Sequence, residues 1–429
     1  MKENIYYPRT LIISRNALSQ GGSNGKVLGQ LFSCWQGDKL AQFYSYNELP
    51  DNPKCTRYWR VTDRDALHSF LSLRKYGGKI NNKELKEPIQ LPGQVANPVK
   101  KSPLTLLLRD LVWNSNRWRS QAFWKWVEEF NPEIIVLMAG ASSFTHKIAL
   151  DVARKFAIPL VVFNTENYFF KNYNYLERKG WRMFYPLYKW QSDRMFRRLM
   201  KYSSHEVYNN NYLERLYRNG FGKEGSVIFQ ATSLTPLPKK RNRDKLVFSY
   251  AGNLGLERHK ALIEIGKVLQ KISREYVLDV YGRVTSSDVK AELENAIGIR
   301  FHGLVPYNQV LKVIEDSDFM IHAESFDPFW VKDLCSAFST KISDILASGR
   351  CLILYAAESL ACVEYVIQNQ CGCVITDPMK LEEHLRNLLN DDKLQQKYIQ
   401  NGISVSQRDM NNKINSERFL MLINNVLGK

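Results

Sequence analysis

Short apolar runs recur along the chain, and each is followed by a polar turn and a stretch with apolar residues three or four positions apart. The first part has such runs at 11–14, 42–46, 58–61, 134–139 and 159–163, and the rest has them at 246–252, 277–282, 299–303, 318–323, 351–355 and 372–376. Runs of this length predict buried strands, and the stretches between them predict amphipathic helices. Because strands that alternate with helices usually pair in parallel, the pattern predicts an α/β protein.

A polar segment with two prolines, TSLTPLPKKRNRDK at 232–245, separates the two sets of strands. This composition is typical of a linker. We therefore expect two Rossmann-like domains, at 1–235 and 236–400, and a C-terminal helical segment, 401–429, that packs back on the first domain. An insertion at about 73–133 begins as a loop and continues as an expected amphipathic helix, PLTLLLRDLVWNSNRWRSQAFWKWVEEF.

Positive charge is concentrated in the first part of the chain. The 429 residues include 60 Lys and Arg against 43 Asp and Glu, a net charge of +17. Residues 1–250 hold 40 basic and 20 acidic residues, whereas residues 251–429 hold 20 and 23, so the two parts carry +20 and −3. A basic surface attracts phosphates, which points to nucleic acid, anionic lipid or a diphosphate substrate.

Cysteine usage and the absence of long apolar runs predict a cytoplasmic protein. The seven cysteines are an odd number, lie mostly in apolar runs and have neither zinc nor redox spacing, so we expect them to be reduced. The opening segment, MKENIYYPRT, has no apolar core of a signal peptide. No run approaches the roughly 20 apolar residues of a membrane span.

A glycine-rich turn, GGSNGK, follows the first predicted strand. It is not a P-loop, because Gln20 stands where that motif needs its first glycine and Lys26 is followed by Val27 rather than Ser or Thr. Its glycines, Gly22 and Gly25 among them, still permit close approach of the backbone to an anion. A flexible surface loop is the alternative.

A second turn, YAGNLGLERHK, repeats the order of strand, glycine turn and helix. Gly252 and Gly255 bracket the turn, and Arg258 and Lys260 follow in the first helical turn. Cations are disfavoured at a helix N-terminus unless an anion is present as well, so the pair indicates a diphosphate site. Solvated charges beside an ordinary turn are the alternative.

A third motif, STKISDILASG, predicts a helix capped by Ser339 or Thr340 and ended by Gly349. The free amides at its start make another anion site. Asp344 lies one turn inside, where a carboxylate can accept the two hydroxyls of a ribose. Glu324 directly follows the predicted strand 318–323, at the strand end where such sheets bind ligands.

These residues resemble the retaining, nucleotide-sugar-dependent glycosyltransferases of the GT-B fold, broadly family 4. YAGNLGLERHKALIEI, VYGRV, RFHGLVPYNQVLKVIEDSDFMIHAE and STKISDILASGRCLIL carry the resemblance, which covers most of 245–380; GGSNGK and IPLVVFNTENYF extend it loosely over 1–235. The GNLGLxR and STK forms look most like enzymes of bacterial surface-polysaccharide assembly. The sequence departs from the family in having nineteen residues between Glu324 and Asp344, where the family has seven between two glutamates.

The resemblance implies an α/β GT-B fold, with two Rossmann-like domains facing across a cleft, and a sugar transfer that needs neither metal nor cofactor because the nucleotide sugar is a co-substrate. Glu324 would position the donor sugar, and Glu166, at the end of a first-domain strand, is a second catalytic candidate. Asp344 would bind the ribose. The other implied donor-binding residues are Gly22, Gly25, Gly252, Asn253, Arg258, Lys260, Ser339, Thr340 and Lys341 at the diphosphate, and His302 and Gly303 at the base.

Two basic aromatic segments, 104–128 and 168–202, suggest contact with an anionic membrane surface and hence a lipid-linked glycan acceptor at the inner face of the plasma membrane. In the first segment Trp113, Trp118, Trp124 and Trp126 interleave with Arg109, Arg117, Arg119 and Lys125. Ordinary helix packing is the alternative. Two other functions stay open: a GT-B-fold nucleotide-sugar epimerase, and a basic protein that binds nucleic acid, although the chain shows no nucleic-acid-binding module and we expect no such partner.

Overall fold

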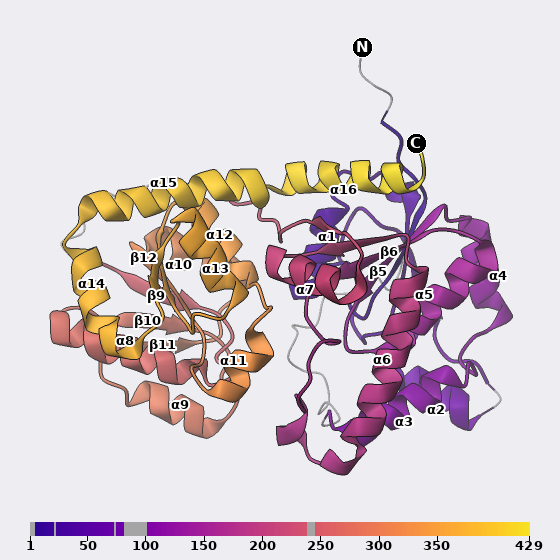
Figure 1. Ribbon diagram of the computed structural model, residues 1–429, viewed down its shortest axis with the longest axis horizontal. Coiled ribbons are helices and arrows are strands. Elements are labelled where there is room, and N and C mark those ends of the chain that lie inside the picture. The colour runs from indigo at the N-terminus through magenta and orange to yellow at the C-terminus, as the bar shows by residue number, and fades with distance from the viewer. Residues whose placement is uncertain (1–4, 21–22, 73, 81–100, 238–244) are drawn as a thin grey trace. The chain divides into compact units, whose positions relative to one another are not determined.

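The computed structural model describes residues 5–20, 23–72, 74–80, 101–237 and 245–429. The chain divides into two compact units (Figure 1). Unit 1 comprises residues 1–229 and 412–429, and unit 2 comprises residues 230–411. The crossing from unit 1 to unit 2 thus comes slightly before the expected domain boundary at 235, and the return comes at 411, within the expected C-terminal segment.

Unit 1 contains a sheet in the order β4-β3-β2-β1-β5-β6-β7-β8. Every neighbouring pair is parallel except β3 with β4. The strands are β1 (Thr10–Ile13), β2 (Leu40–Tyr44), β3 (Arg57–Arg60), β4 (Gly78–Lys79), β5 (Ile134–Ala139), β6 (Leu160–Asn164), β7 (His205–Tyr208) and β8 (Ser226–Val227). All five runs predicted in this region form strands, whereas β4, β7 and β8 were not foreseen.

Helices cover both faces of this sheet because alternate strand residues point to opposite sides. Ile12 packs with α1 and α16, whereas Leu11 and Ile13 pack with α3, α4, α5 and α6. The helices are α1 (Ser23–Leu31), α2 (Asp63–Leu71), α3 (Pro103–Asn114), α4 (Gln121–Phe130), α5 (Ser143–Phe156), α6 (Tyr185–Tyr202), α7 (Asn211–Phe221) and α16 (Asn412–Val426). Phe419, Leu420 and Ile423 of α16 are buried with residues of α1, so the C-terminal helix belongs to the core of unit 1 (Figure 1).

The amphipathic helix expected within residues 103–130 is two helices, α3 and α4. Asn116 between them has a left-handed backbone (φ 57°), which ends α3, and the Ser120 side chain accepts a hydrogen bond from the Phe123 amide and caps α4. Trp113, Trp118 and Trp126 are buried in the core. These tryptophans therefore do not form a membrane-facing surface, and the packing alternative is correct for this segment.

Unit 2 contains a wholly parallel sheet in the order β11-β10-β9-β12-β13-β14. Its strands are β9 (Phe248–Ala251), β10 (Leu278–Tyr281), β11 (Ile299–Gly303), β12 (Phe319–Ala323), β13 (Cys351–Tyr355) and β14 (Cys373–Ile375), and all six were predicted. Its helices are α8 (Arg258–Ile272), α9 (Ser287–Glu294), α10 (Tyr307–Asp316), α11 (Pro328–Leu334), α12 (Thr340–Ser348), α13 (Ala361–Asn369), α14 (Leu381–Leu389) and α15 (Asp392–Asp409).

Each sheet has one point at which the strand order reverses. In unit 1 this point lies between β1 and β5, and in unit 2 it lies between β9 and β12. In open parallel sheets, ligands bind at the carboxyl ends of the strands beside such a point. Among the helices of the described ranges, none is both long enough and apolar enough to cross a membrane.

Candidate functional site

The carboxyl ends of β9 and β12 carry the residues that flank the reversal point of unit 2. Gly252 follows β9, and Glu324 follows β12. The two strands are neighbours in the sheet, so the turn after β9 and the residue after β12 lie side by side. The expected diphosphate site and the expected catalytic carboxylate are therefore placed together by the topology.

Glu324 is paired with Arg258, the first residue of α8. Arg258 Nε lies 2.7 Å from Glu324 Oε2, and Arg258 Nη2 lies 3.1 Å from Oε1, so the guanidinium makes a two-pronged contact. Both side chains are buried, at 11% and 7% exposed. Such a geometry fixes the planes of both groups, so Arg258 is held at the start of α8 in one orientation.

His322, on β12, supplies a third contact to this carboxylate. Its Nε2 lies 3.1 Å from Glu324 Oε1, and the ring is fully buried. Burial lowers the pKa of His322, so the ring is neutral near pH 7, and its Nε2 makes a polar contact with the carboxylate. Burial raises the pKa of Glu324, but the contact with His322 and the charge of Arg258 outweigh burial and lower it to about 2.

His322 was not among the site residues predicted from the sequence. The signal that it contacts the site was present in the spacing, because residues two apart on an extended segment face the same side. His322 and Glu324 have that spacing at the end of β12. A histidine two residues before a carboxylate at a strand end is therefore a better indicator of a shared site than a lone histidine.

Lys341, in the first turn of α12, brings a second cation to the same place. Its Nζ lies 3.2 Å from the Tyr250 hydroxyl and 4.8 Å from the centre of that ring. Burial and the positive charge of Arg258 lower the pKa of Lys341 to about 8, although Glu324 opposes the change. A Cβ added at Gly252 would lie 2.0 Å from Lys341 Nζ, so a glycine is needed here for the lysine to reach this position.

The turn between β9 and α8 is held in an unusual backbone conformation. Leu256 and Glu257 have φ of 60° and 61°, a left-handed region that non-glycine residues rarely adopt and that costs roughly 1–3 kcal/mol at each residue. Asn253 Oδ1 accepts a hydrogen bond from the Gly255 amide at 2.9 Å and braces the turn. Strain of this kind is characteristic of functional sites, because the surrounding structure has to maintain it.

Helix α12 starts at the expected residue. Ser339 is its N-cap and Thr340 its first residue, so the amides of the first turn face out of the helix as predicted. Asp344, the predicted ribose ligand, is 9% exposed, and its Oδ1 accepts a hydrogen bond from the Thr232 hydroxyl at 2.6 Å. The ribose role of Asp344 therefore remains a prediction, and the structure adds Thr232 as its neighbour.

Several predicted donor residues lie apart from the cluster of Arg258, Glu324 and Lys341. Lys260 is 61% exposed and pairs with Glu257 at 3.0 Å, so its ion pair is a surface contact. His302 Nε2 lies 2.7 Å from Asp279 Oδ1 and the ring is stacked on Tyr281, at the carboxyl ends of β10 and β11.

Close backbone contacts bring the strand ends of β10 and β11 near that of β9. Gly303 has a left-handed backbone (φ 73°), and its carbonyl accepts a hydrogen bond from the Gly282 amide at 2.8 Å. A Cβ at Gly282 would lie 1.9 Å from the Gly252 carbonyl oxygen. These contacts place His302 and Gly303 on the strands adjoining the Gly252 turn.

The glycine turn of unit 1 is only partly described. Gly22 lies outside the described residues. Gly25 is inside the first turn of α1, where a Cβ would lie 2.3 Å from the Ala17 carbonyl oxygen, so glycine is needed for a close backbone approach. Glu166 is exposed at the end of β6, beside the buried Asn167. Its catalytic role stays a prediction.

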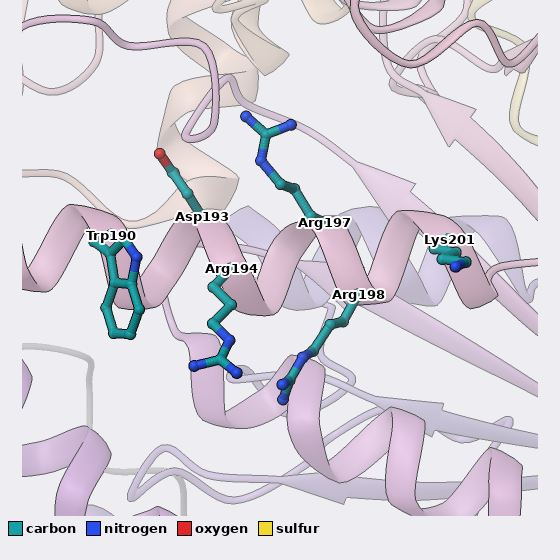
Figure 2. Close-up of a pocket in the computed structure, with 6 residues that line it drawn as sticks. All are labelled: Trp190, Asp193, Arg194, Arg197, Arg198 and Lys201. Carbon is teal, nitrogen blue, oxygen red and sulfur yellow. The ribbon is translucent and has the colours of Figure 1, made fainter.

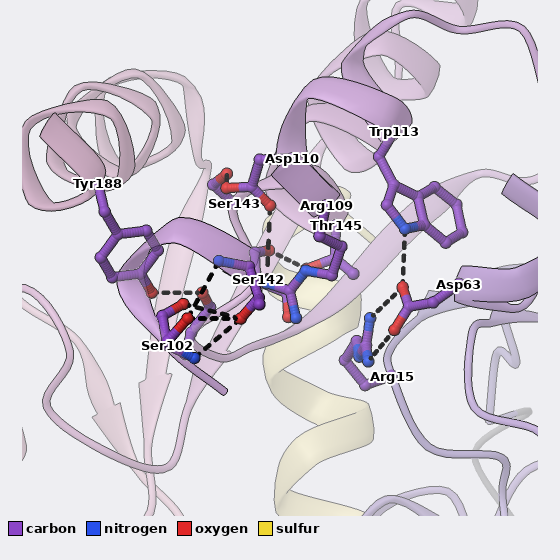
Figure 3. A network of polar contacts seen from close by, with 12 residues as sticks. Arg15, Asp63, Ser102, Arg109, Asp110, Trp113, Ser142, Ser143, Thr145 and Tyr188 are labelled. Atoms are coloured by element: carbon purple, nitrogen blue, oxygen red, sulfur yellow. Dashed lines mark hydrogen bonds and ion pairs between the residues drawn. The ribbon is translucent and has the colours of Figure 1, made fainter. Parts of the chain in front are cut away.

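A polar network, buried at Asp110, Trp113 and Ser143 and exposed at Asp63, lies at the reversal point of the unit 1 sheet (Figure 3). Arg15, directly after β1, makes two hydrogen bonds with Asp63 at 3.2 and 3.0 Å, and Trp113 Nε1 donates to the same carboxylate at 2.8 Å. Nearby, the Ser143 hydroxyl at the start of α5 donates to Asp110 at 2.5 Å.

Sequence reasoning missed this network. The network had one local signal in the sequence, the polar residue Arg15 after the first strand. The other members of the network come from segments far along the chain. Asp63 comes after β3, Asp110 and Trp113 from α3, and Ser143 after β5. Only the fold shows that these segments meet.

Electrostatics favours an anion at the unit 2 cluster. Two cations, Arg258 and Lys341, accompany one carboxylate, Glu324, and the N-terminus of α12 adds partial positive charge. No group of three metal-binding side chains occurs among the residues that the structure describes. This arrangement is able to hold and stabilise a diphosphate.

Comparisons with known proteins agree with this geometry. Residues 236–405 match the family described as glycosyl transferases group 1. HepE of Anabaena in complex with UDP is similar in structure, with a TM-score of 0.64 and 10% identity over 97% of this chain and 100% of that chain. WaaG, a glycosyltransferase involved in lipopolysaccharide biosynthesis, has a TM-score of 0.54 and 10% identity over 96% of this chain and 98% of that chain.

TarM has a TM-score of 0.52 and 14% identity over 71% of this chain and 57% of that chain. No curated protein sequence matches the chain. At these identities the similar structures establish the fold, and the family match is confined to unit 2. Residues 236–405 therefore resemble the group 1 glycosyltransferases, and the chain has the GT-B fold of the similar structures.

Proposed function

We propose that the protein transfers a sugar from a nucleotide diphosphate sugar to a hydroxyl of a lipid-linked glycan, in the biosynthesis of a capsule, O-antigen or exopolysaccharide. The observation that carries the donor half of this proposal is the convergence of Arg258, Lys341 and the α12 N-terminus at the reversal point of unit 2. The involvement of the similar protein WaaG in lipopolysaccharide biosynthesis supports the acceptor half.

Positive charge held in place is what this reaction needs most. As the sugar leaves, negative charge grows on the diphosphate, and preorganised cations and amides stabilise that charge without rearranging. Arg258 is held by Glu324, and Lys341 reaches the site past Gly252. These groups neutralise the leaving group without a metal ion, in keeping with the metal-independent mechanism and retention of configuration that the family resemblance implies.

Glu324 acts in this proposal through Arg258. Both of its carboxylate oxygens contact the guanidinium, and its pKa of about 2 keeps it ionised, so it is not a proton donor. Asp344 would bind the ribose, and His302 and Gly303 the base. The roles of Glu166, Gly22 and Gly25, in unit 1, stay predictions of the sequence.

A thermal-shift screen tests the donor site. UDP-, GDP-, ADP- and dTDP-sugars are added to the full chain, and we expect one base to raise the melting temperature. UDP is the first choice, because HepE binds it. Lys341→Met should abolish that shift and Asp344→Ala should weaken it, whereas Lys260→Met, which removes an exposed lysine, should preserve most of it. No stabilisation by any donor would contradict the proposal.

The acceptor is tested separately. The nucleotide sugar that binds, with its sugar radiolabelled, is added to the enzyme and isolated bacterial membranes. The transfer of label into solvent-extractable lipid is then measured. Label in lipid, lost in Lys341→Met, supports the proposal. Interconversion or release of the free sugar in the absence of membranes would instead indicate the epimerase or a hydrolase.

A further inference from the structure

Helix α6 of unit 1 presents one continuous exposed stripe. Its opposite face is buried through Tyr188, Phe196, Leu199 and Met200. At about 100° per residue, the exposed members all fall within an arc of roughly 120°, so they form a single surface. These members are Pro186, Leu187, Trp190, Arg194, Arg197, Arg198 and Lys201.

The first end of the stripe is apolar. Trp190 and Leu187 are 58% and 54% exposed, and Trp181 and Met183, just before the helix, are 59% and 78% exposed. Four large apolar side chains thus lie open within ten residues of the chain. Exposed apolar groups gathered in this way mark a contact surface, whereas scattered single ones need no explanation.

The second end is cationic and hollowed. A shallow depression of about 500 Å³ is lined by Trp190, Asp193, Arg194, Arg197, Arg198 and Lys201 (Figure 2). Asp193, the single acidic residue of this lining, forms an ion pair with Lys189, with 2.5 Å between Asp193 Oδ1 and Lys189 Nζ. Within the described ranges, the four cations of the depression have no carboxylate at ion-pair distance, so their charge is available to an external anion.

Figure 2 shows how these side chains leave the helix. Trp190, Arg194 and Arg198 extend along one side of α6, and Arg197 extends along the other. The Arg194 guanidinium lies 5.4 Å from the centre of the Trp190 ring, which couples the apolar end of the stripe to the cationic end. A partner has to offer hydrocarbon and negative charge within the length of one helix.

We infer that this stripe, residues 181–201, docks the protein on the surface of an anionic lipid bilayer, with the apolar end inserted between head groups and the cationic end on lipid phosphates. Nucleic acid would match the cations but leaves the apolar end without a partner. Interfacial aromatics beside cations are what a bilayer surface binds. The inference deepens the proposed membrane location, and it replaces the 104–128 segment, whose tryptophans are mostly buried, by a surface centred on α6.

Vesicle co-sedimentation of the full chain tests the inference without any sugar donor. The protein is mixed with vesicles of phosphatidylcholine alone, or with about 30% phosphatidylglycerol. We expect binding to the anionic vesicles only, weakened at about 0.5 M salt. Removing three charges in Arg194→Gln, Arg197→Gln and Arg198→Gln should weaken binding on the order of a hundredfold, at about fivefold for each charge.

The apolar end and the controls need separate variants. Combining Met183→Ser, Leu187→Ser and Trp190→Ser should weaken binding at least about tenfold while leaving the melting temperature unchanged. The matched control for these apolar changes is Ile297→Ser, in unit 2 and 62% exposed, which should bind as the wild type does.

The charge control removes three exposed lysines of unit 2 together, in Lys380→Gln, Lys393→Gln and Lys397→Gln. If this control binds vesicles as the wild type does and the arginine variant does not, then the position of the cations, rather than the net charge of the protein, determines vesicle binding. Each α6 variant should keep the thermal shift by the nucleotide sugar. If no nucleotide sugar binds at all, the vesicle result stands by itself.

Three outcomes would overturn the inference. The first is equal binding to neutral and anionic vesicles, or no binding to either. The second is an arginine variant that binds as the wild type does. The third is tighter binding to single-stranded RNA than to vesicles, lost in the arginine variant but kept in the serine variant, which would assign the stripe to nucleic acid.

Discussion

Lys341 makes donor affinity depend on pH in a range where few side chains titrate. Its pKa is about 8 in the empty protein, against 10.5 for an ordinary lysine, because of burial and the charge of Arg258. A bound diphosphate stabilises the ammonium and returns its pKa toward the ordinary value. Binding therefore requires the proton to be present, and affinity should fall as the pH rises above about 8.

The size of the effect follows from the fraction of protonated lysine. At the pKa half of the protein carries the proton and one pH unit above it only about a tenth does, so the dissociation constant should rise about fivefold between pH 8 and pH 9. The stability of the protein without donor should change with pH in the opposite direction. Between about pH 8 and pH 10.5 the unfolded chain binds the proton more tightly, so the stability of the empty protein should rise with pH, by about 3 kcal/mol at most.

Titration calorimetry with the donor found in the screen, at several pH values from about 7 to 9.5, measures the dependence. Lys341→Met should bind more weakly at the lower pH and show a flat profile, since nothing else in the site titrates in this range. Lys260→Met should keep the slope of the wild type. A wild-type profile that is flat through pH 9.5, or a slope that persists in Lys341→Met, would refute the reasoning.

Three further predictions concern the same cluster. Gly252→Ala should leave the melting temperature unchanged but weaken donor binding about tenfold, because the new methyl group displaces only the mobile end of Lys341; Gly255→Ala, whose Cβ would meet nothing closer than 3.2 Å, is the control. His322→Leu should lower kcat/KM about tenfold through loss of its polar contact with Glu324, and His322→Gln, which keeps a polar group there, should restore most of it in the same assay. The low pKa of Glu324 contributes about 3 kcal/mol of stability above about pH 4.5 that is lost as the pH falls toward 2, so urea unfolding at decreasing pH should show a slope that is reduced in Glu324→Gln.

The fold was predictable because eleven of its strands lie on short runs in which apolar side chains recur, although some also hold polar residues. The missed strands lack that signal: β4 and β8 have two residues each, and β7 contains Glu206. Glu206 is 2% exposed and lies 3.2 Å from Lys223, so a charge is buried in a strand because a distant lysine neutralises it. An apolar pattern cannot reveal such a strand, since the compensating residue is seventeen positions away.

The candidate site was predictable where the cause is local. The turn at Gly252 and the cap at Ser339 follow from glycine and serine chemistry, and both are present. Lys260 is different: residues two apart on a helix do not face the same side, so Arg258 and Lys260 were never equivalent candidates. The contact of Asp344 with Thr232 joins residues 112 positions apart and has no signature in the sequence.

The Glu324 carboxylate is compatible with a proposed anion site because the charged groups of the cluster have different roles. Arg258 and Glu324 neutralise each other, so the pair adds little net attraction for an anion. Its contribution is to hold the Arg258 guanidinium in one orientation, which would otherwise have to be ordered when the diphosphate binds. Net attraction then comes from Lys341 and the amides of α12. Because the amides do not titrate and Glu324 stays ionised down to about pH 2, the charge of the site near neutral pH is set by one ammonium group, and Lys341 alone should govern how the donor site responds to pH.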